Sequence, residues 1–396
     1  MRMLVICLTL GSLVWLTPSQ ASPNLLTVVG FMAVTGLTVT RVFRRAGVPG
    51  LLGALIAGFV LSQTQIISAE TLHESDLLYA FSLVWAGFYM SSGITPRILS
   101  NPRLVKASLC IYLIPLFFIL FFMLFHGFST SVAIPVALLA GSSTLLFLPS
   151  NSKMRGEIVP LGQMVTLMSF SFWMIFSLNP ASVFASHSVL EISIDGLLLL
   201  VLLEATVQVS KVARTQTGQQ MALLVLAYLL ALASYERGFS PMCIGFPAGV
   251  YLSLRRENRS QMHALAVSDT ILSFAMTSFV LHVSLTSAAI LTYSQGTTLG
   301  FYFAVLLASK TIAGLIAQHF FLLSPKSWLP IIPHGLLAFL FLPIPPTTLF
   351  SSNGSMHSAV LASLVLLAFA YPVCSRSLSI IKKDPLASHR PTRRVL

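Results

Sequence analysis

Long apolar runs separated by short polar breaks follow one another along almost the whole chain. Each run is long enough to cross a hydrocarbon core of about 30 Å as a helix. After residue 22 we predict thirteen spans, at residues 24–41, 47–64, 77–95, 107–126, 131–148, 158–179, 192–210, 219–234, 240–254, 265–291, 299–322, 328–348 and 357–374. The pattern therefore predicts an all-α polytopic membrane protein.

The composition agrees with this fold class, since 56% of the residues are hydrophobic and only 9% are charged. In soluble domains about a quarter of the residues are charged. A net charge of +12 would suggest a nucleic-acid partner in a soluble protein, so the placement of the charge decides its meaning.

The basic residues lie on one side of the predicted spans. If the first span runs from outside to inside, 20 of the 23 Lys and Arg residues fall in cytoplasmic loops and in the tail at 376–396, and the other three are Arg2, Arg237 and Lys310. The opposite loops carry acids: Glu70, Glu74, Asp76, Glu191, Asp195 and Glu236. The positive-inside rule then predicts an outer N-terminus and an inner C-terminus. We expect a multi-pass protein of a bacterial inner membrane, with the lipid bilayer and not nucleic acid as its partner.

The first 22 residues have a basic start, an apolar run and small residues in "SQAS", as a signal peptide does. A short signal-anchor helix is the alternative. Cleavage would leave the first span starting outside, as the charge distribution requires.

An internal repeat divides the chain further. "GVPGLLGALIAGFVL" from Gly47 and "GFSPMCIGFPAGVYL" from Gly238 have equal length, and Ala57-Gly58 aligns with Ala248-Gly249. The two copies run in opposite directions through the membrane, which is the usual construction of secondary transporters. We predict inverted repeats of six spans each at 24–179 and 219–375, joined by a linker span at 192–210. Small residues in any packed membrane helix look alike, which is the simpler interpretation.

Two predicted spans are interrupted by residues that break helices. The fifth contains Ser142, Ser143 and Thr144, and the twelfth contains Pro333, His334 and Gly335. Unwound backbone inside a membrane lines a cavity or a substrate site. These two segments are therefore predicted to lie at the centre of a pathway.

The order of these motifs resembles the Kef-type branch of the cation:proton antiporter family. The resemblance rests on "VPGLLGALIAGFVLS", "LVWAGFYMSSGITPRIL", the Ser-Ser-Thr run, Gly162-Gln163, "FPAGVYL" and Lys310. It implies a sodium/proton antiporter-like fold with discontinuous, crossing helices. It also implies exchange of a monovalent cation for protons by alternating access, and a possible homodimer.

One departure from the family pattern concerns the ion-binding acid. The resemblance places this acid in the helix after Gly162-Gln163, where the present sequence has Phe172 and Trp173. These aromatic rings could hold an organic solute or a cation, or they could simply pack. Coupling of cations to protons is thus open to doubt.

Lys310 is the one basic residue predicted at mid-membrane, where an isolated charge is costly. It could be neutral because burial disfavours the charged form, paired with another acid, or in contact with an anionic substrate. It could also be a relic that donates hydrogen bonds to carbonyls of the broken helices.

Other polar residues in the spans have simpler interpretations. Glu204 shares a helical stripe with Gln208 and Lys211, which predicts a local polar face. Asp269 and Glu157 are expected at helix N-termini. His282, His319 and His334 could relay protons, although a lone membrane histidine is more often only hydrogen-bonded.

The sequence therefore favours a secondary transporter of a small ion or solute rather than an enzyme. The expected pathway residues are Ser142, Ser143, Thr144, Phe172, Trp173, Lys310, Pro333, His334 and Gly335. The alternatives are a non-transporting, antiporter-like partner or sensor subunit, and an anion or organic-solute carrier that uses Lys310. No phosphate loop, metal cluster or catalytic constellation is apparent in the sequence, so no cofactor is expected.

Overall fold

The computed structural model describes eleven helical regions and their adjoining turns. The described residues are 25–45, 53–61 without 55, 59 and 60, 76–91, 94–128, 130–141, 155–177, 189–212, 215–237, 241–254, 269–286 and 295–321. Every regular element among them is an α-helix, which confirms the predicted fold class. The leader at 1–22, the spans at 328–348 and 357–374, and the tail at 376–396 lie outside these residues.

The helices follow the predicted spans closely, and most ends agree within a few residues. They are α2 Leu25–Arg45, α5 Asp76–Ser91, α6 Pro96–Leu99, α7 Pro102–Phe125, α8 Thr130–Gly141, α9 Arg155–Ser177, α11 Val189–Val212, α12 Gln216–Arg237, α13 Pro241–Leu254, α15 Asp269–Thr286 and α16 Gln295–Phe321. The four-residue helix α6 is an addition to the prediction. As expected, α15 begins at Asp269 and Glu157 lies in the first turn of α9.

Local capping explains where α6 and α7 begin. Thr95 Oγ1 accepts a hydrogen bond from the Ile98 amide, and Asn101 Oδ1 accepts one from the Arg103 amide at 3.1 Å. Each cap is followed by a proline, whose missing N–H is no loss in the first helical turn. At its other end α7 ends at Phe125 with His126 as the C-cap, and Gly127 adopts a φ of 77° in the turn that follows.

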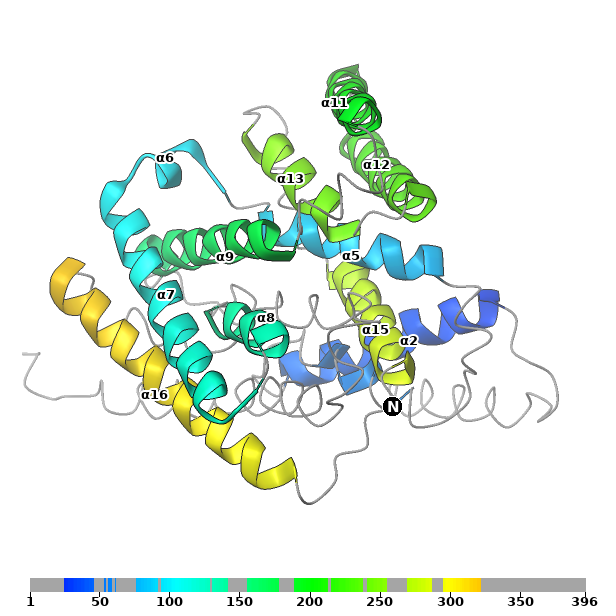
Figure 1. The fold of residues 1–396 in the computed structure, drawn as a ribbon. Helices are drawn as coiled ribbons and strands as arrows, with labels where there is room; N and C mark the ends of the chain where they lie inside the picture. The colour runs from blue at the N-terminus through cyan, green and yellow to red at the C-terminus, as the bar shows by residue number, and fades with distance from the viewer. Residues whose placement is uncertain are drawn as a thin grey trace, which may run out of the picture.

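The helices form two groups that meet along α9 (Figure 1). In the α7 group, α7 packs against α8, α9 and α16. In the α5 group, α5 packs against α12, α13 and α15, while α2 lies on α15 and α11 lies on α12. The contact of α9 with α5 joins the two groups.

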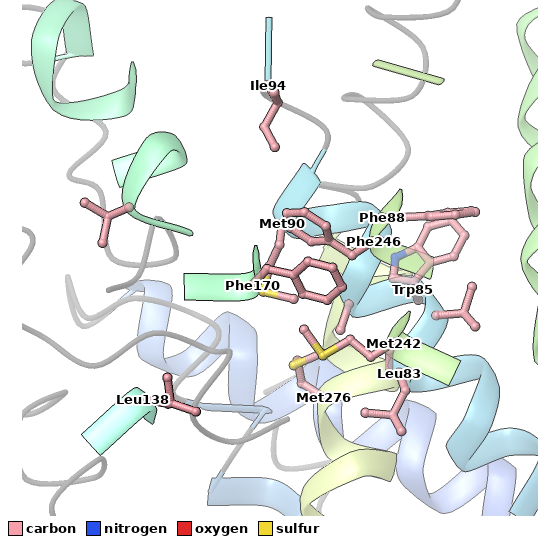
Figure 2. Packing of buried hydrophobic residues seen from close by; sticks show 14 of the residues in the cluster. Leu83, Trp85, Phe88, Met90, Ile94, Leu138, Phe170, Met242, Phe246 and Met276 are labelled. Atoms are coloured by element: carbon pink, nitrogen blue, oxygen red, sulfur yellow. The ribbon is translucent and has the colours of Figure 1, made fainter. Parts of the chain in front are cut away.

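An apolar cluster fills the junction between the groups (Figure 2). Phe170 of α9 stacks on Phe246 of α13, with ring centroids 4.0 Å apart and planes 21° from parallel. Trp85 and Phe88 of α5 belong to the same buried cluster. Burial of several aromatic rings here, at roughly 25 cal/mol per Å² of apolar area, contributes strongly to holding the groups together.

The two Ala-Gly pairs pack in a reciprocal way. A Cβ added to Gly58 would lie 2.6 Å from the carbonyl oxygen of Thr277 in α15. A Cβ added to Gly249 would lie 3.0 Å from the Cα of Phe88 in α5. Each glycine thus lets its backbone approach a helix from the other predicted half of the chain.

The outer surface of the described helices is strongly apolar. Phe117, Phe118, Phe121 and Phe125 of α7 are exposed, as are Leu197, Leu198 and Val201 of α11. Among the described residues, Pro102–Phe125, Thr217–Glu236 and Phe301–Phe321 are long and apolar enough to cross a membrane. Exposed apolar side chains on such helices are suited to contact with lipid, as expected of an integral membrane protein.

Candidate substrate site

Lys310 lies in the buried stripe of α16. Its side chain is 5% exposed, and the stripe continues through Leu306, Ser309, Ala313 and Ala317 at helical spacing. Among the described helices, α7 is the principal neighbour of α16. Lys310 is therefore buried within the protein, and its place in a transport pathway stays a prediction.

The helices α7 and α16 pack against each other and run in opposite directions (Figure 1). Arg103, near the start of α7, donates from its Nε to the carbonyl oxygen of Phe321, the last residue of α16. Tyr112 lies nine residues after Arg103, or about 13.5 Å along the axis, and Lys310 lies eleven residues before Phe321, or about 16.5 Å. Tyr112 and Lys310 are thus each about three turns from the residue of their own helix that makes this contact.

Tyr112 was not among the residues expected from the sequence, yet it lies at the centre of the α7 group. Its side chain is completely buried, and within the described residues its hydroxyl has no hydrogen-bond partner. A Cβ added to Gly141 would lie 2.6 Å from two carbons of the Tyr112 ring. Gly141 ends α8, so the phenol ring covers the point where the predicted Ser142-Ser143-Thr144 interruption begins.

Phe172 is the third member of this arrangement. Its ring centroid lies 5.2 Å from that of Tyr112, and its side chain is half-buried. The resemblance places an acid at Phe172 or Trp173, so an aromatic contact between α7 and α9 occupies this neighbourhood instead. Trp173 belongs to α9, but its side chain is outside the described part of the structure.

The helix α9 adds further buried polar groups. Gly162 and Gln163, which lie within α9 just after Pro160, are both buried. The Thr166 hydroxyl donates to the carbonyl of Gly162 at 2.8 Å, whereas Gln163 Oε1 has no hydrogen-bond partner within the described residues. A buried polar atom without a partner costs about 1–3 kcal/mol, unless water or a ligand satisfies it.

Several expected pathway residues cannot be placed. Ser142, Ser143 and Thr144 of the fifth span and Pro333, His334 and Gly335 of the twelfth lie outside the described residues. The described structure therefore brings together Lys310, Phe172 and Tyr112 within one helix group, and leaves the predicted crossing of the two interrupted segments as a prediction.

Glu204 has two hydrogen-bond partners. The spacing along its helix predicts the first partner but not the second. Its Oε1 accepts from Gln208 Nε2 at 3.0 Å, one turn along α11. Its Oε2 accepts from the Tyr251 hydroxyl of α13 at 2.6 Å. This carboxylate belongs to a contact in the α5 group, whereas Phe172 and Lys310 belong to helices of the α7 group.

The histidines considered as proton relays are not placed in the candidate site by the described structure. His319 is exposed in the last turn of α16, with its ring edge-on to Phe320. The side chain of His282 lies outside the part of α15 that is described, as does the whole of His334. Within the described residues, no three His, Cys, Asp or Glu side chains are grouped as metal ligands.

Comparison with solved structures identifies the arrangement of the helices. The chain is similar to the sodium proton antiporter of Methanocaldococcus jannaschii, with a TM-score of 0.57 over 90% of this chain and 98% of that one. The protein has a sodium/proton antiporter fold. Sequence identity to that antiporter is 14%, so the similarity concerns the fold alone. No family model and no curated protein matches the sequence.

Proposed function

We propose that this antiporter-fold protein is a secondary membrane transporter that works by alternating access. The observation that carries the proposal is the burial of Lys310 in α16, a helix of the α7 group, in a chain whose fold matches an antiporter over 90% of its length. A buried ionisable side chain in a membrane helix is costly and usually marks a transport pathway. The proposed exchange is solute:proton antiport of the monovalent-cation type.

The reciprocal packing of the two Ala-Gly pairs supports two inverted halves. Gly58 approaches α15, the third span of the second half, and Gly249 approaches α5, the third span of the first half. The first spans repeat this relation, because α2 packs on α15 and α12 packs on α5. We propose repeat boundaries of 24–179 and 219–375, with α11 as the linker between them.

Some residues of the proposed pathway belong to helices of the structure, and the others lie outside its described residues. Phe172, Trp173 and Lys310 belong to α9 and α16, and the remaining residues are Ser142, Ser143, Thr144, Pro333, His334 and Gly335. The interrupted segments would supply backbone groups at mid-membrane. We propose an inner-membrane location with the N-terminus outside and the tail inside, as the loop charges indicate.

Flux in proteoliposomes tests the proposal directly. Purified protein is reconstituted with a pH gradient, and the collapse of the gradient is followed on addition of Na⁺, K⁺ or Li⁺. Lys310→Gln should abolish any flux that the protein supports, whereas Lys106→Ala, at an exposed basic residue of α7, should leave it unchanged. Flux that survives Lys310→Gln would remove Lys310 from the pathway. If no cation, anion or solute moves, the protein is a non-transporting partner or sensor subunit.

A carrier of anions or organic solutes is the second candidate, and the site itself favours it. Phe172 stands where the resemblance expects a carboxylate, and the interior of the described α7, α8, α9 and α16 beyond the first turn of α9 contains no Asp or Glu. Gradient collapse by anions, and not by cations, would select this candidate.

A further inference from the structure

We propose that the outer face of α2 binds one anionic phospholipid, whose headgroup is held by Arg41 and Arg45. The inference goes beyond the proposed function and does not depend on transport. It is carried by the face of the helix on which the two arginines lie, by the apolar surface that continues from them and by the charge that they place together.

The first observation concerns the two sides of α2. One side is covered, since a Cβ added to Gly36 would lie 3.1 Å from the carbonyl oxygen of Ser273 in α15. Met32, one turn before Gly36, is buried on the same side. Arg41 and Arg45 are both exposed, and they follow Gly36 by five and nine residues. At 100° per residue these positions lie on the side of the helix that faces away from α15.

The second observation is an open apolar surface on the same side as the arginines. Val34 is 42% exposed, and a Cβ added to Gly30 would meet nothing within 4 Å. Steps of four, seven and four residues place Gly30, Val34, Arg41 and Arg45 in one stripe along the helix. From Gly30 to Arg41 the stripe is about 16.5 Å long, close to the thickness of one leaflet, about 15 Å. It therefore has the length of one lipid chain, with the basic residues at the end where a headgroup lies.

The third observation is the pairing of two like charges. Side chains four residues apart on a helix are neighbours, and like charges at this spacing destabilise the helix. α2 contains no Asp or Glu, so neither charge is balanced within its own helix. A phosphate between Arg41 and Arg45 removes the repulsion, and guanidinium groups donate paired hydrogen bonds to phosphate oxygens. At a membrane surface, the phosphate that also carries a net negative charge and an apolar chain is that of an anionic phospholipid.

Native mass spectrometry of the full chain, released from detergent micelles, tests this assignment with two phospholipids of the same acyl composition. Phosphatidylglycerol is anionic, whereas phosphatidylcholine has the same phosphate but no net charge. Phosphatidylglycerol should bind more tightly. Arg41→Gln and Arg45→Gln should each weaken its binding by about fivefold, as expected for one basic residue near an anionic lipid. Without lipid, both variants should unfold at the same or a slightly higher temperature, because a like-charge pair is removed.

Lys106→Gln is the matched control, because it removes the same charge from an exposed position of another helix, α7. It should leave the binding of phosphatidylglycerol unchanged. An equal loss of binding in Lys106→Gln and in the two arginine variants would overturn the site, since the net charge of the protein would then explain the binding.

The remaining outcomes decide the class of the ligand. Equal binding of the two phospholipids would overturn its anionic character. Glycerol 3-phosphate has a charged phosphate but no acyl chain, so it should compete only weakly. If it displaced phosphatidylglycerol at a similar concentration, the occupant would be a free phosphate and not a lipid. Unchanged binding of phosphatidylglycerol in both arginine variants would also overturn the site. None of these measurements requires flux, so a failure here leaves the proposed function to its own test.

Discussion

Arg103 of α7 donates a hydrogen bond to the main-chain carbonyl of Phe321, 218 residues away at the end of α16. The last carbonyls of a helix lack intrahelical partners and carry partial negative charge, so a guanidinium is a favourable cap. The contact joins the fourth span of one predicted half to the fourth span of the other.

Arg103→Ala should therefore lower the unfolding temperature of the purified protein. The free energy of unfolding should fall by only about 0.3–1 kcal/mol, because Arg103 is exposed. Lys106→Ala is the control, since Lys106 is an exposed basic residue one turn further along α7. A larger loss in Lys106→Ala than in Arg103→Ala, measured by thermal unfolding in detergent, would contradict the capping role.

The two repeat glycines should tolerate no side chain. In Gly58→Ala the new Cβ would meet the main chain of α15, which cannot move alone, so about 1–3 kcal/mol of stability should be lost. Gly30→Ala is the control, because nothing lies within 4 Å of its added Cβ. That substitution should be neutral or stabilising by up to about 1 kcal/mol, since alanine favours helix more than glycine does.

A rescue experiment distinguishes the two glycines. The nearest atom to an added Cβ at Gly249 is the Oγ of Ser91, a side-chain atom that can be removed. Ser91→Ala should restore part of the stability lost in Gly249→Ala and none of that lost in Gly58→Ala. Equal effects of Ser91→Ala in both backgrounds would show that the local packing is different from that described.

The hydrogen bond between Tyr251 and Glu204 should couple α13 to α11. Tyr251→Phe leaves one oxygen of a half-buried carboxylate without this donor, and should cost about 1–2 kcal/mol of stability. In Glu204→Gln the amide can still accept this bond, so the loss should be smaller. A double-mutant cycle between Tyr251→Phe and Glu204→Ala measures the coupling, and Tyr228→Phe at an exposed position of α12 is the control. Additive losses would mean that the pair does not interact in solution.

Sequence patterns predicted the helices well because membrane spans must be long, apolar and internally hydrogen-bonded. The span predicted at 158–179 corresponds to α9, Arg155–Ser177. Lys310 was singled out as a candidate because a charge stands out in an apolar run. Glu204 and Gln208 were paired correctly because four-residue spacing places side chains on one helical face.

Contacts between helices could not be predicted in the same way. Tyr112 gives no signal in the run "CIYLIPLFF", because tyrosine is common in membrane helices and its burial depends on the packing of α8 and α9 against α7. The partner of Glu204 on α13 was missed for the same reason. Spacing along one helix reports neighbours on that helix, whereas Tyr251 is 47 residues further along the chain.

The stack of Phe170 on Phe246 leads to the last prediction, because it joins the two helix groups. Phe170→Ala should cost about 3–5 kcal/mol, since it removes a buried ring from a packed cluster. Phe121→Ala on the outer face of α7, where the ring is 74% exposed, should cost much less. The pair itself should contribute about 0.5–1.5 kcal/mol beyond its buried area, which a double-mutant cycle with Phe246→Ala would reveal.

The same stack predicts an effect on transport. If alternating access requires the α7 group to move relative to the α5 group, this contact must change between states. Phe170→Leu should then alter flux under conditions in which the variant remains folded. An unchanged flux together with the expected loss of stability would assign the stack to folding alone.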